Sequence, residues 1–232
     1  MSPSKVETIC SLLFSKYGQP QWKGGRDPLS ELIATILSQN TSERNSHRAF
    51  LNLKRRFPTW EEVRKAPQGE IAEAIKVGGL SAQKAKRIKS LLGRIYEEEG
   101  VLDLSFLANM EVNRVQRYLL RFKGVGPKTA ACVVLFSLGK PSMPVDTHIL
   151  RVTKRLGLVP QRASAVQAQA ALEGILPSPL IYPLHLGFIE HGRRVCKAKR
   201  PLCTDCVLRS ECDYPEKTNL LKKRLDTVGL VC

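Results

Sequence analysis

No hydrophobic run in the sequence is long enough to cross a bilayer, which argues against a membrane protein. The first residues, MSPSKVETICSLLFSKYG, also lack the long apolar stretch and small-residue cleavage site of a secretory signal peptide. We therefore expect a cytoplasmic protein with no membrane partner. In such a reducing compartment, clustered cysteines are more often metal ligands or catalytic groups than disulfides.

Acidic residues are scarce, because 21 Asp and Glu stand against 37 Lys and Arg, and the formal net charge is +16. This excess favours a polyanionic partner, since each neutralised phosphate releases condensed counterions. A solvated basic surface is the alternative interpretation. The basic residues gather in segments 54–56, 84–89, 193–200 and 222–224. We therefore expect nucleic acid as the partner.

Stretches that alternate apolar and polar residues are few, and no repeat of fixed period is evident. Helical spacing dominates instead. Asp27 and Pro28 form a helix start, and the apolar residues that follow are spaced as one buried helical face: Leu29, Leu32, Ile33 and Ile36. The same spacing recurs at Val115, Tyr118, Leu119 and Phe122, and at Ile149, Val152 and Leu156. The pattern predicts a nearly all-α fold.

The stretch YLLRFKGVGPKTAACVVLFSLG places a Gly-Val-Gly turn between two apolar helical patterns. Gly124 and Gly126 leave backbone N–H groups uncovered, and the next helix directs the positive end of its dipole to the same point. A backbone site for one DNA phosphate is therefore expected. A tight helix–helix turn without a ligand is the alternative.

Two residues near this turn are candidate catalytic groups. Lys128 opens the helix after the turn, where its amine can attack carbon or contact a phosphate. Asp146, in the segment PVDTHILRV, begins another helix, so it is either a simple N-cap or a carboxylate that stabilises positive charge on a sugar.

Four cysteines lie in the segment CKAKRPLCTDCVLRSEC, at Cys196, Cys203, Cys206 and Cys212. Four thiolates this close in sequence suit tetrahedral zinc or an iron–sulfur cluster. The three remaining cysteines stand outside this spacing and are interpreted as buried or incidental thiols: Cys10, Cys132 and Cys232.

Three segments, LLRFKGVGPKTA, VDTHILRV and HGRRVCKAKRPLCTDCVLRSEC, resemble in order and spacing the endonuclease III family of helix–hairpin–helix DNA glycosylases. The resemblance extends over about 28–212. It implies a six-helix barrel with the hairpin (27–140), a terminal helical domain (1–26 plus 141–232), and a DNA-binding cleft between them. It also implies a structural [4Fe–4S] cluster on the four cysteines of 196–212.

The resemblance further implies roles for individual residues. Lys128 matches the family's nucleophile and Asp146 its essential aspartate. LSQNTSERN and VGGLSAQKAKRI resemble two wedge loops that fill the space left by an extruded nucleotide, through Gln39 or Asn40 in the first and Leu80 in the second. The residues expected to contact DNA around the hairpin and the cluster are Gly124, Val125, Gly126, Thr129, Arg193, Lys197 and Lys199.

The function implied is base excision repair by a monomeric enzyme that acts on duplex DNA, close to the nucleoid. It would remove oxidised pyrimidines and nick the abasic site by β-elimination. A mismatch-specific or broader thymine/uracil glycosylase is the alternative, although such relatives typically lack the lysine. Adenine-removing relatives carry a glutamate where this chain has Thr35. A non-catalytic hairpin module or a redox-responsive regulator explains the charge but not Lys128 together with Asp146.

Overall fold

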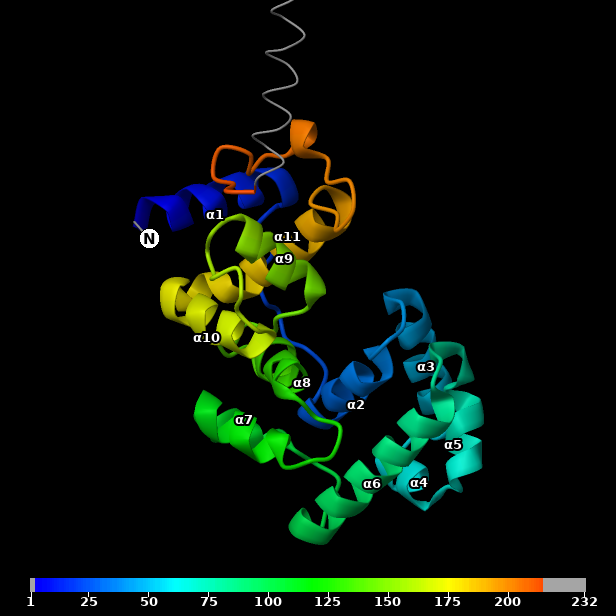
Figure 1. The fold of residues 1–232 in the computed structure, drawn as a ribbon. Coiled ribbons are helices and arrows are strands. Elements are labelled where there is room, and N and C mark those ends of the chain that lie inside the picture. The colour runs from blue at the N-terminus through cyan, green and yellow to red at the C-terminus, as the bar shows by residue number, and fades with distance from the viewer. Residues whose placement is uncertain (1–2, 215–232) are drawn as a thin grey trace, which may run out of the picture. The chain divides into compact units, whose positions relative to one another are not determined.

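The computed structural model describes residues 3–214, and every regular element in this range is helical (Figure 1), which confirms the all-α expectation. Chain contacts divide these residues into one unit of 22–144 and a second of 3–21 with 145–214. The domains expected from the sequence are 27–140 and, together, the two flanking segments 1–26 and 141–232. Cys232 and the basic segment 222–224 lie outside the described residues. None of the described helices has the length and hydropathy needed to cross a bilayer.

The unit of residues 22–144 is a bundle of helices around one hydrophobic core. Its longest helix, α6, packs against α2, α4 and α5. In chain order the elements are α2 (Pro28–Ser38), α3 (Glu43–Arg56), α4 (Trp60–Lys65), α5 (Gln68–Ala74), the 3₁₀ turn η1 (Lys76–Gly78), α6 (Ser81–Glu99), the 3₁₀ turn η2 (Ser105–Asn109), α7 (Val112–Leu120), α8 (Pro127–Cys132) and the π-helical turn η3 (Val133–Ser137).

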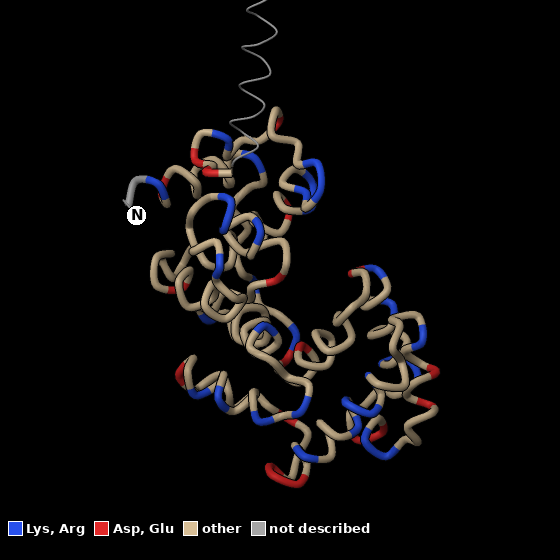
Figure 2. Tube along the Cα trace, viewed as in Figure 1, with Lys and Arg blue, Asp and Glu red and all other residues tan. Residues whose placement is uncertain are grey.

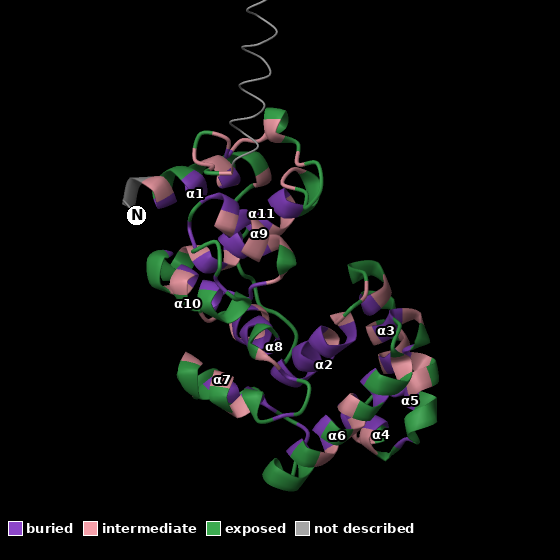
Figure 3. Cartoon of the chain, viewed as in Figure 1, coloured by how far each residue is buried: buried purple, intermediate pink, exposed green. Residues whose placement is uncertain are grey.

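Helix α2 is buried over most of its surface (Figure 3). It begins as predicted, because the Asp27 carboxylate accepts a hydrogen bond from the Ser30 backbone N at 2.8 Å and Pro28 occupies the first turn. The apolar face expected from the sequence lies in the core at Leu29, Leu32, Ile33 and Ile36. Burying such side chains is the dominant favourable contribution to folding.

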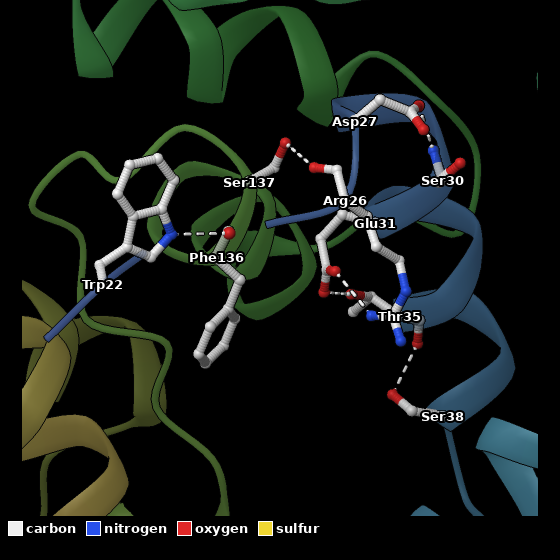
Figure 4. Close-up of polar contacts among 9 residues, drawn as sticks. All are labelled: Trp22, Arg26, Asp27, Ser30, Glu31, Thr35, Ser38, Phe136 and Ser137. Carbon is white, nitrogen blue, oxygen red and sulfur yellow. Dashed lines mark hydrogen bonds and ion pairs between the residues drawn. The ribbon is translucent and has the colours of Figure 1, made fainter. Parts of the chain in front are cut away.

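Polar contacts fasten the segment before α2 to the π-helical turn η3 (Figure 4). The Trp22 indole N–H donates to the carbonyl oxygen of Phe136 at 2.9 Å, and the Ser137 hydroxyl donates to the carbonyl oxygen of Arg26 at 2.7 Å. Arg26 also forms an ion pair with the largely buried Glu31 at 3.0 Å. The start of α2 is therefore held both by hydrogen bonds to η3 and by the ion pair between Arg26 and Glu31.

The second unit combines the N-terminal helix with the C-terminal third of the described chain. Helix α11 packs against both α1 and α9. Gly192 permits the second contact, because a Cβ there would lie 2.9 Å from Cβ of His148. The elements are α1 (Pro3–Tyr17), α9 (Thr147–Arg155), α10 (Ala165–Ile175), the 3₁₀ turn η4 (Ser178–Leu180), α11 (Ile181–Arg194) and the 3₁₀ turn η5 (Cys203–Asp205).

Helix α9 buries the apolar face that its sequence predicts, with Ile149, Val152 and Leu156 almost fully inaccessible. The helix ends at Arg155, and Gly157 follows with φ of 68°, in the left-handed region that glycine adopts readily. The carboxyl end of α9 is thereby turned toward the C-terminal segment, and the Asp213 backbone N donates to the carbonyl oxygen of Arg155 at 2.8 Å.

Candidate active site

Helices α7 and α8 form the predicted hairpin. Gly124 has φ of 88°, so the turn needs a residue that enters the left-handed region without strain. Gly126 is extended, caps α8, and has no heavy atom within 4 Å of where a Cβ would be, so its backbone lies open to a ligand. Val125 and Thr129 are buried, so their side chains offer little surface to DNA.

Lys128 lies in the first turn of α8, directly after the hairpin, and its side chain is exposed. Within the described residues its amine has no ion pair or hydrogen-bond partner. An amine that is not engaged by a carboxylate or a carbonyl can approach an external carbon or phosphate. The position agrees with the nucleophile predicted from the sequence, while the role itself stays a prediction.

Asp146 is the N-cap of α9. Its Oδ1 atom accepts hydrogen bonds from the backbone N of His148 at 2.9 Å and of Ile149 at 2.8 Å. The helix dipole and these two donors favour the ionised carboxylate. Both bonds use Oδ1, so Oδ2 is without a partner in the described part of the chain. Asp146 and Lys128 belong to different units of the chain.

The two predicted wedge loops are residues 38–42 and 76–81. Each contains a non-glycine residue with positive φ. Asn40 has φ of 53° and Leu80 has φ of 50°, and among the described non-glycine residues only Arg200 also has positive φ. A positive φ is a genuine outlier for leucine, and such strain persists only where the surrounding structure imposes it. Both side chains are exposed, and Leu80 presents 52% of its surface to solvent.

Gln39 differs from Asn40, because its side chain is held inside the unit. Its Nε2 donates to the carbonyl oxygen of Gly124 at 3.2 Å, and its Oε1 accepts from Nη1 of Arg87 at 2.8 Å. Gln39 therefore connects the first wedge loop to the hairpin and to α6. Of the two candidates for insertion, Asn40 is the one whose side chain is unengaged within the described residues.

Thr35, which the sequence predicts to stand in the place of the glutamate of adenine-removing relatives, is buried on α2. Its hydroxyl donates to Glu31 Oε1 at 3.4 Å, on the preceding turn (Figure 4). The carboxylate nearest to Thr35 along α2 is thus paired with Arg26 and not available to a substrate.

Lys and Arg follow α3, α6 and the hairpin of the first unit (Figure 2). Segment 84–89 is one of the basic clusters noted in the sequence, and only part of it is exposed. Lys84 is only 1% exposed, and Lys89 donates to the backbone carbonyl oxygen of Arg64 at 2.9 Å, whereas Lys86 is exposed. In the second unit, Arg193, Lys197 and Lys199 are exposed as expected.

The four cysteines of the C-terminal segment form no disulfide within the described residues, and each is partly buried. Burial, and then the charges of Cys196, Cys212 and Cys203, raise the pKa of Cys206 to about 11. Within the described residues, however, no three His, Cys, Asp or Glu side chains are arranged to hold a metal ion. The four thiols are chemically suited to ligate an iron–sulfur cluster, but their side chains are not arranged around a common point.

Sequence reasoning missed two residues that border these thiols. Arg155 Nη1 donates to Sγ of Cys196 at 3.3 Å, and the Cys212 thiol donates to the carbonyl oxygen of Arg155 at 3.4 Å. His191 Nε2 lies 3.5 Å from Sγ of Cys206, and burial lowers the pKa of His191 to about 4. The signal was available for His191, which belongs to a motif that carries the family resemblance, whereas Arg155 lies three residues beyond the end of VDTHILRV.

A family model described as "HhH-GPD superfamily base excision DNA repair protein" matches residues 33–178. The chain is 35% identical to endonuclease III of Thermotoga maritima, over 81% of this chain and 84% of that protein. It is 40% identical to a putative DNA glycosylase of Arabidopsis thaliana, over 77% of this chain but only 58% of the plant protein's length. A solved endonuclease III, trapped as a covalent intermediate with DNA, superposes with a TM-score of 0.79 at 27% identity, covering 94% of this chain and 99% of that one.

Proposed function

Because the chain belongs to the HhH-GPD superfamily of base excision DNA repair proteins and is an endonuclease III-type DNA glycosylase, we propose that it excises oxidised pyrimidines and nicks the resulting abasic site. The observation that carries this proposal is the exposed amine of Lys128, unengaged within the described residues, directly after the hairpin. A glycosylase that uses only water as its nucleophile has no need for such an amine.

The chemistry proposed for Lys128 proceeds through a covalent intermediate. The lone pair of the neutral Nζ forms a bond to C1′ of the damaged nucleotide while the glycosidic bond breaks, and the base leaves with that electron pair and takes up a proton. Opening of the sugar gives a Schiff base between Nζ and C1′. Loss of a proton from C2′ then expels the 3′ phosphate, which is the nick.

Asp146 is proposed to supply negative charge to this reaction. The two backbone bonds to Oδ1 fix the orientation of the carboxylate, and they leave Oδ2 without a partner within the described residues. A fixed anion stabilises the cationic character that develops at C1′ as the base leaves, because it needs no reorganisation at that moment.

The damaged nucleotide must leave the base stack before Lys128 can reach C1′. We assign Asn40 and Leu80 to the space it vacates, since both are exposed and both lie at strained backbone positions. The open backbone at Gly126 and the exposed Lys197 and Lys199 are assigned to phosphates of the same duplex.

The four cysteines are proposed to hold a [4Fe–4S] cluster, which would supply structural order to segment 196–212. Support comes from their donor chemistry, from their close spacing in the sequence, and from the N–H···S hydrogen bond that Arg155 makes to Cys196. No step of base excision depends on the cluster.

Borohydride trapping tests the proposed nucleophile. The protein is incubated with borohydride and duplexes that each carry one oxidised pyrimidine, an abasic site, or a G·T mismatch. We expect a covalent adduct with the first two, and none with Lys128→Gln. Lys123→Gln removes another exposed lysine of the same hairpin and should still form the adduct. Excision of mismatched thymine without an adduct would favour the alternative, a mismatch-specific glycosylase.

A further inference from the structure

Lys84 is a fully buried lysine on the first turn of α6. Only 1% of its surface is exposed, and its Nζ donates to the carbonyl oxygen of Leu37 at 2.7 Å and of Gly78 at 2.9 Å. A buried ammonium group is costly unless hydrogen bonds compensate for its lost hydration. Two short bonds to carbonyl oxygens supply that compensation.

The two carbonyl groups come from segments far apart in sequence, and each lies just before one wedge residue. Leu37 is in the last turn of α2, three positions before Asn40, and Gly78 is two positions before Leu80. One ammonium group therefore joins the end of α2, 47 residues before it in the chain, to the second wedge loop.

Lys84 also fixes the far side of Leu80. Its backbone N donates to the carbonyl oxygen of Leu80 at 2.9 Å, which is the first hydrogen bond of α6. Leu80 is thus held between the side-chain contact to Gly78 and the backbone contact that follows it. Such restraint on both sides is what a leucine needs in order to persist at φ of 50°.

We infer that Lys84 is a positioning residue, which sets Asn40 and Leu80 at a fixed separation so that the two enter the duplex together. The inference rests on the proposed function. Lys84 is too buried to touch DNA itself, so it acts only through the two loops. Filling the vacated space requires side chains that resist the closing of the base stack, and loops that move independently would be pushed back.

Lys89 provides a matched comparison within the same helix. Its Nζ likewise donates to two backbone carbonyl oxygens, those of Arg64 and Ala66, but these belong to the end of α4 and not to a wedge loop. Lys84→Met and Lys89→Met both remove an amine that ties α6 to a neighbouring segment. Only the first removes a tie between the wedge loops.

The experiment follows base unstacking without relying on catalysis. Duplexes carry a stable abasic-site analogue opposite 2-aminopurine, whose fluorescence rises when it leaves the stack. Wild type and Lys89→Met should raise the fluorescence equally at saturating protein, and Lys84→Met should raise it far less. Affinity for undamaged duplex should be unchanged in both variants, because neither amine contacts DNA.

Excision kinetics supply a second readout. In single turnover, Lys84→Met should slow release of a base-paired lesion on the order of tenfold or more, since small misplacements are costly in rate. It should change release from single-stranded DNA much less, because no stack has to be opened there. An equal loss on both substrates, or equal fluorescence from Lys84→Met and wild type, would overturn the inference.

The test of Lys84 can be interpreted even if excision fails or the Lys84→Met variant does not fold. An enzyme that excises no lesion would contradict the proposed function, while the fluorescence test of Lys84 would still stand. If Lys84→Met does not fold, amide hydrogen exchange of the wild type decides. After correction for intrinsic rates, the protected amides of segments 37–42 and 76–81 should then give one common free energy of opening. Clearly different free energies of opening for the two segments would contradict the inference.

Discussion

The side-chain amide of Gln39 donates to the carbonyl oxygen of Gly124 at 3.2 Å, and this bond joins the first wedge loop to the hairpin. The same amide accepts from Arg87, so three segments of the first unit meet at one side chain. A residue engaged in this way stabilises the unliganded arrangement. The neighbouring Asn40 has no such engagement within the described residues and can move with the DNA.

Substitutions at Asn40 and at Gln39 should have different effects on excision and on stability. Asn40→Gly should slow excision from paired duplex and leave the thermal midpoint almost unchanged, because the side chain is exposed and glycine adopts a φ of 53° without strain. Gln39→Ala should cost about 1 kcal/mol of unfolding free energy through lost hydrogen bonds. It should also weaken binding to all duplexes alike, since the hairpin is less well held. Thermal unfolding and competition binding measure both effects, and the reverse pattern would assign insertion to Gln39.

Asp146 can be changed without removing its cap. Asn caps helices about as well as Asp, so Asp146→Asn should keep the thermal midpoint within a degree or two, whereas Asp146→Ala should cost about 1 kcal/mol. Both variants should lose base excision by roughly 10²-fold or more, since neither retains the carboxylate charge. Single-turnover rates test this. Full activity in Asp146→Asn would show that Asp146 is only a cap.

The hairpin backbone is tested at Gly126, where alanine fits the extended conformation and meets no neighbouring atom. Gly126→Ala should leave stability unchanged but weaken duplex binding roughly tenfold, as expected for one lost bond to a charged group. Gly93→Ala, in the middle of α6, is the matched control and should raise stability by about 0.5–1 kcal/mol without affecting binding. Unchanged binding by Gly126→Ala would place the phosphate elsewhere.

Metal content tests the proposed cluster directly. Anaerobically purified protein should contain about four irons per chain and absorb broadly in the visible range. Cys203→Ser should lose iron and thermal stability together, whereas Cys10→Ser, in the same unit but outside the spacing, should keep its iron. One zinc per chain and no iron would contradict the proposed cluster.

Tyr118 makes the free energy of unfolding depend on pH in the alkaline range. Burial, and then the hydrogen bond to Glu99 at 2.8 Å, raise the pKa of Tyr118 above its ordinary value of about 10. Above that pH the native state holds a proton that the unfolded state has lost, so stability is complete below about pH 10 and falls as pH rises further. Tyr118→Phe should reduce this decline by up to about 1.4 kcal/mol per pH unit, measured by urea unfolding between pH 9 and 11.

The helices and their caps could be predicted from the sequence because they depend on local spacing. Asp27, Pro28 and the apolar face of α2 are contiguous, and the structure confirms them. Burial of single charged residues is a different matter. Lys84 was interpreted as part of a basic surface, yet its ammonium group is enclosed by α2 and η1, which only tertiary packing brings together.

The choice between Gln39 and Asn40 shows the same limit within the candidate site. Their side chains are chemically similar and adjacent, so the sequence offers no basis for preferring either. The structure distinguishes them by what lies nearby, namely Gly124 and Arg87. In the same way, the motif around Val125 and Thr129 predicts a DNA contact, but not that both side chains belong to the interior.

The division of the chain has a consequence for its biosynthesis. Residues 22–144 are contiguous, so this unit can fold on the ribosome as soon as it has emerged. The other unit pairs α1 with α11, which is translated much later, and Lys5 near the start of the chain pairs with Asp213 at 3.3 Å. The segment bearing α1 must therefore wait, with Val6, Ile9 and Leu13 still uncovered, while the intervening unit is made. During that interval a nascent chain offers an apolar helix that a chaperone can bind.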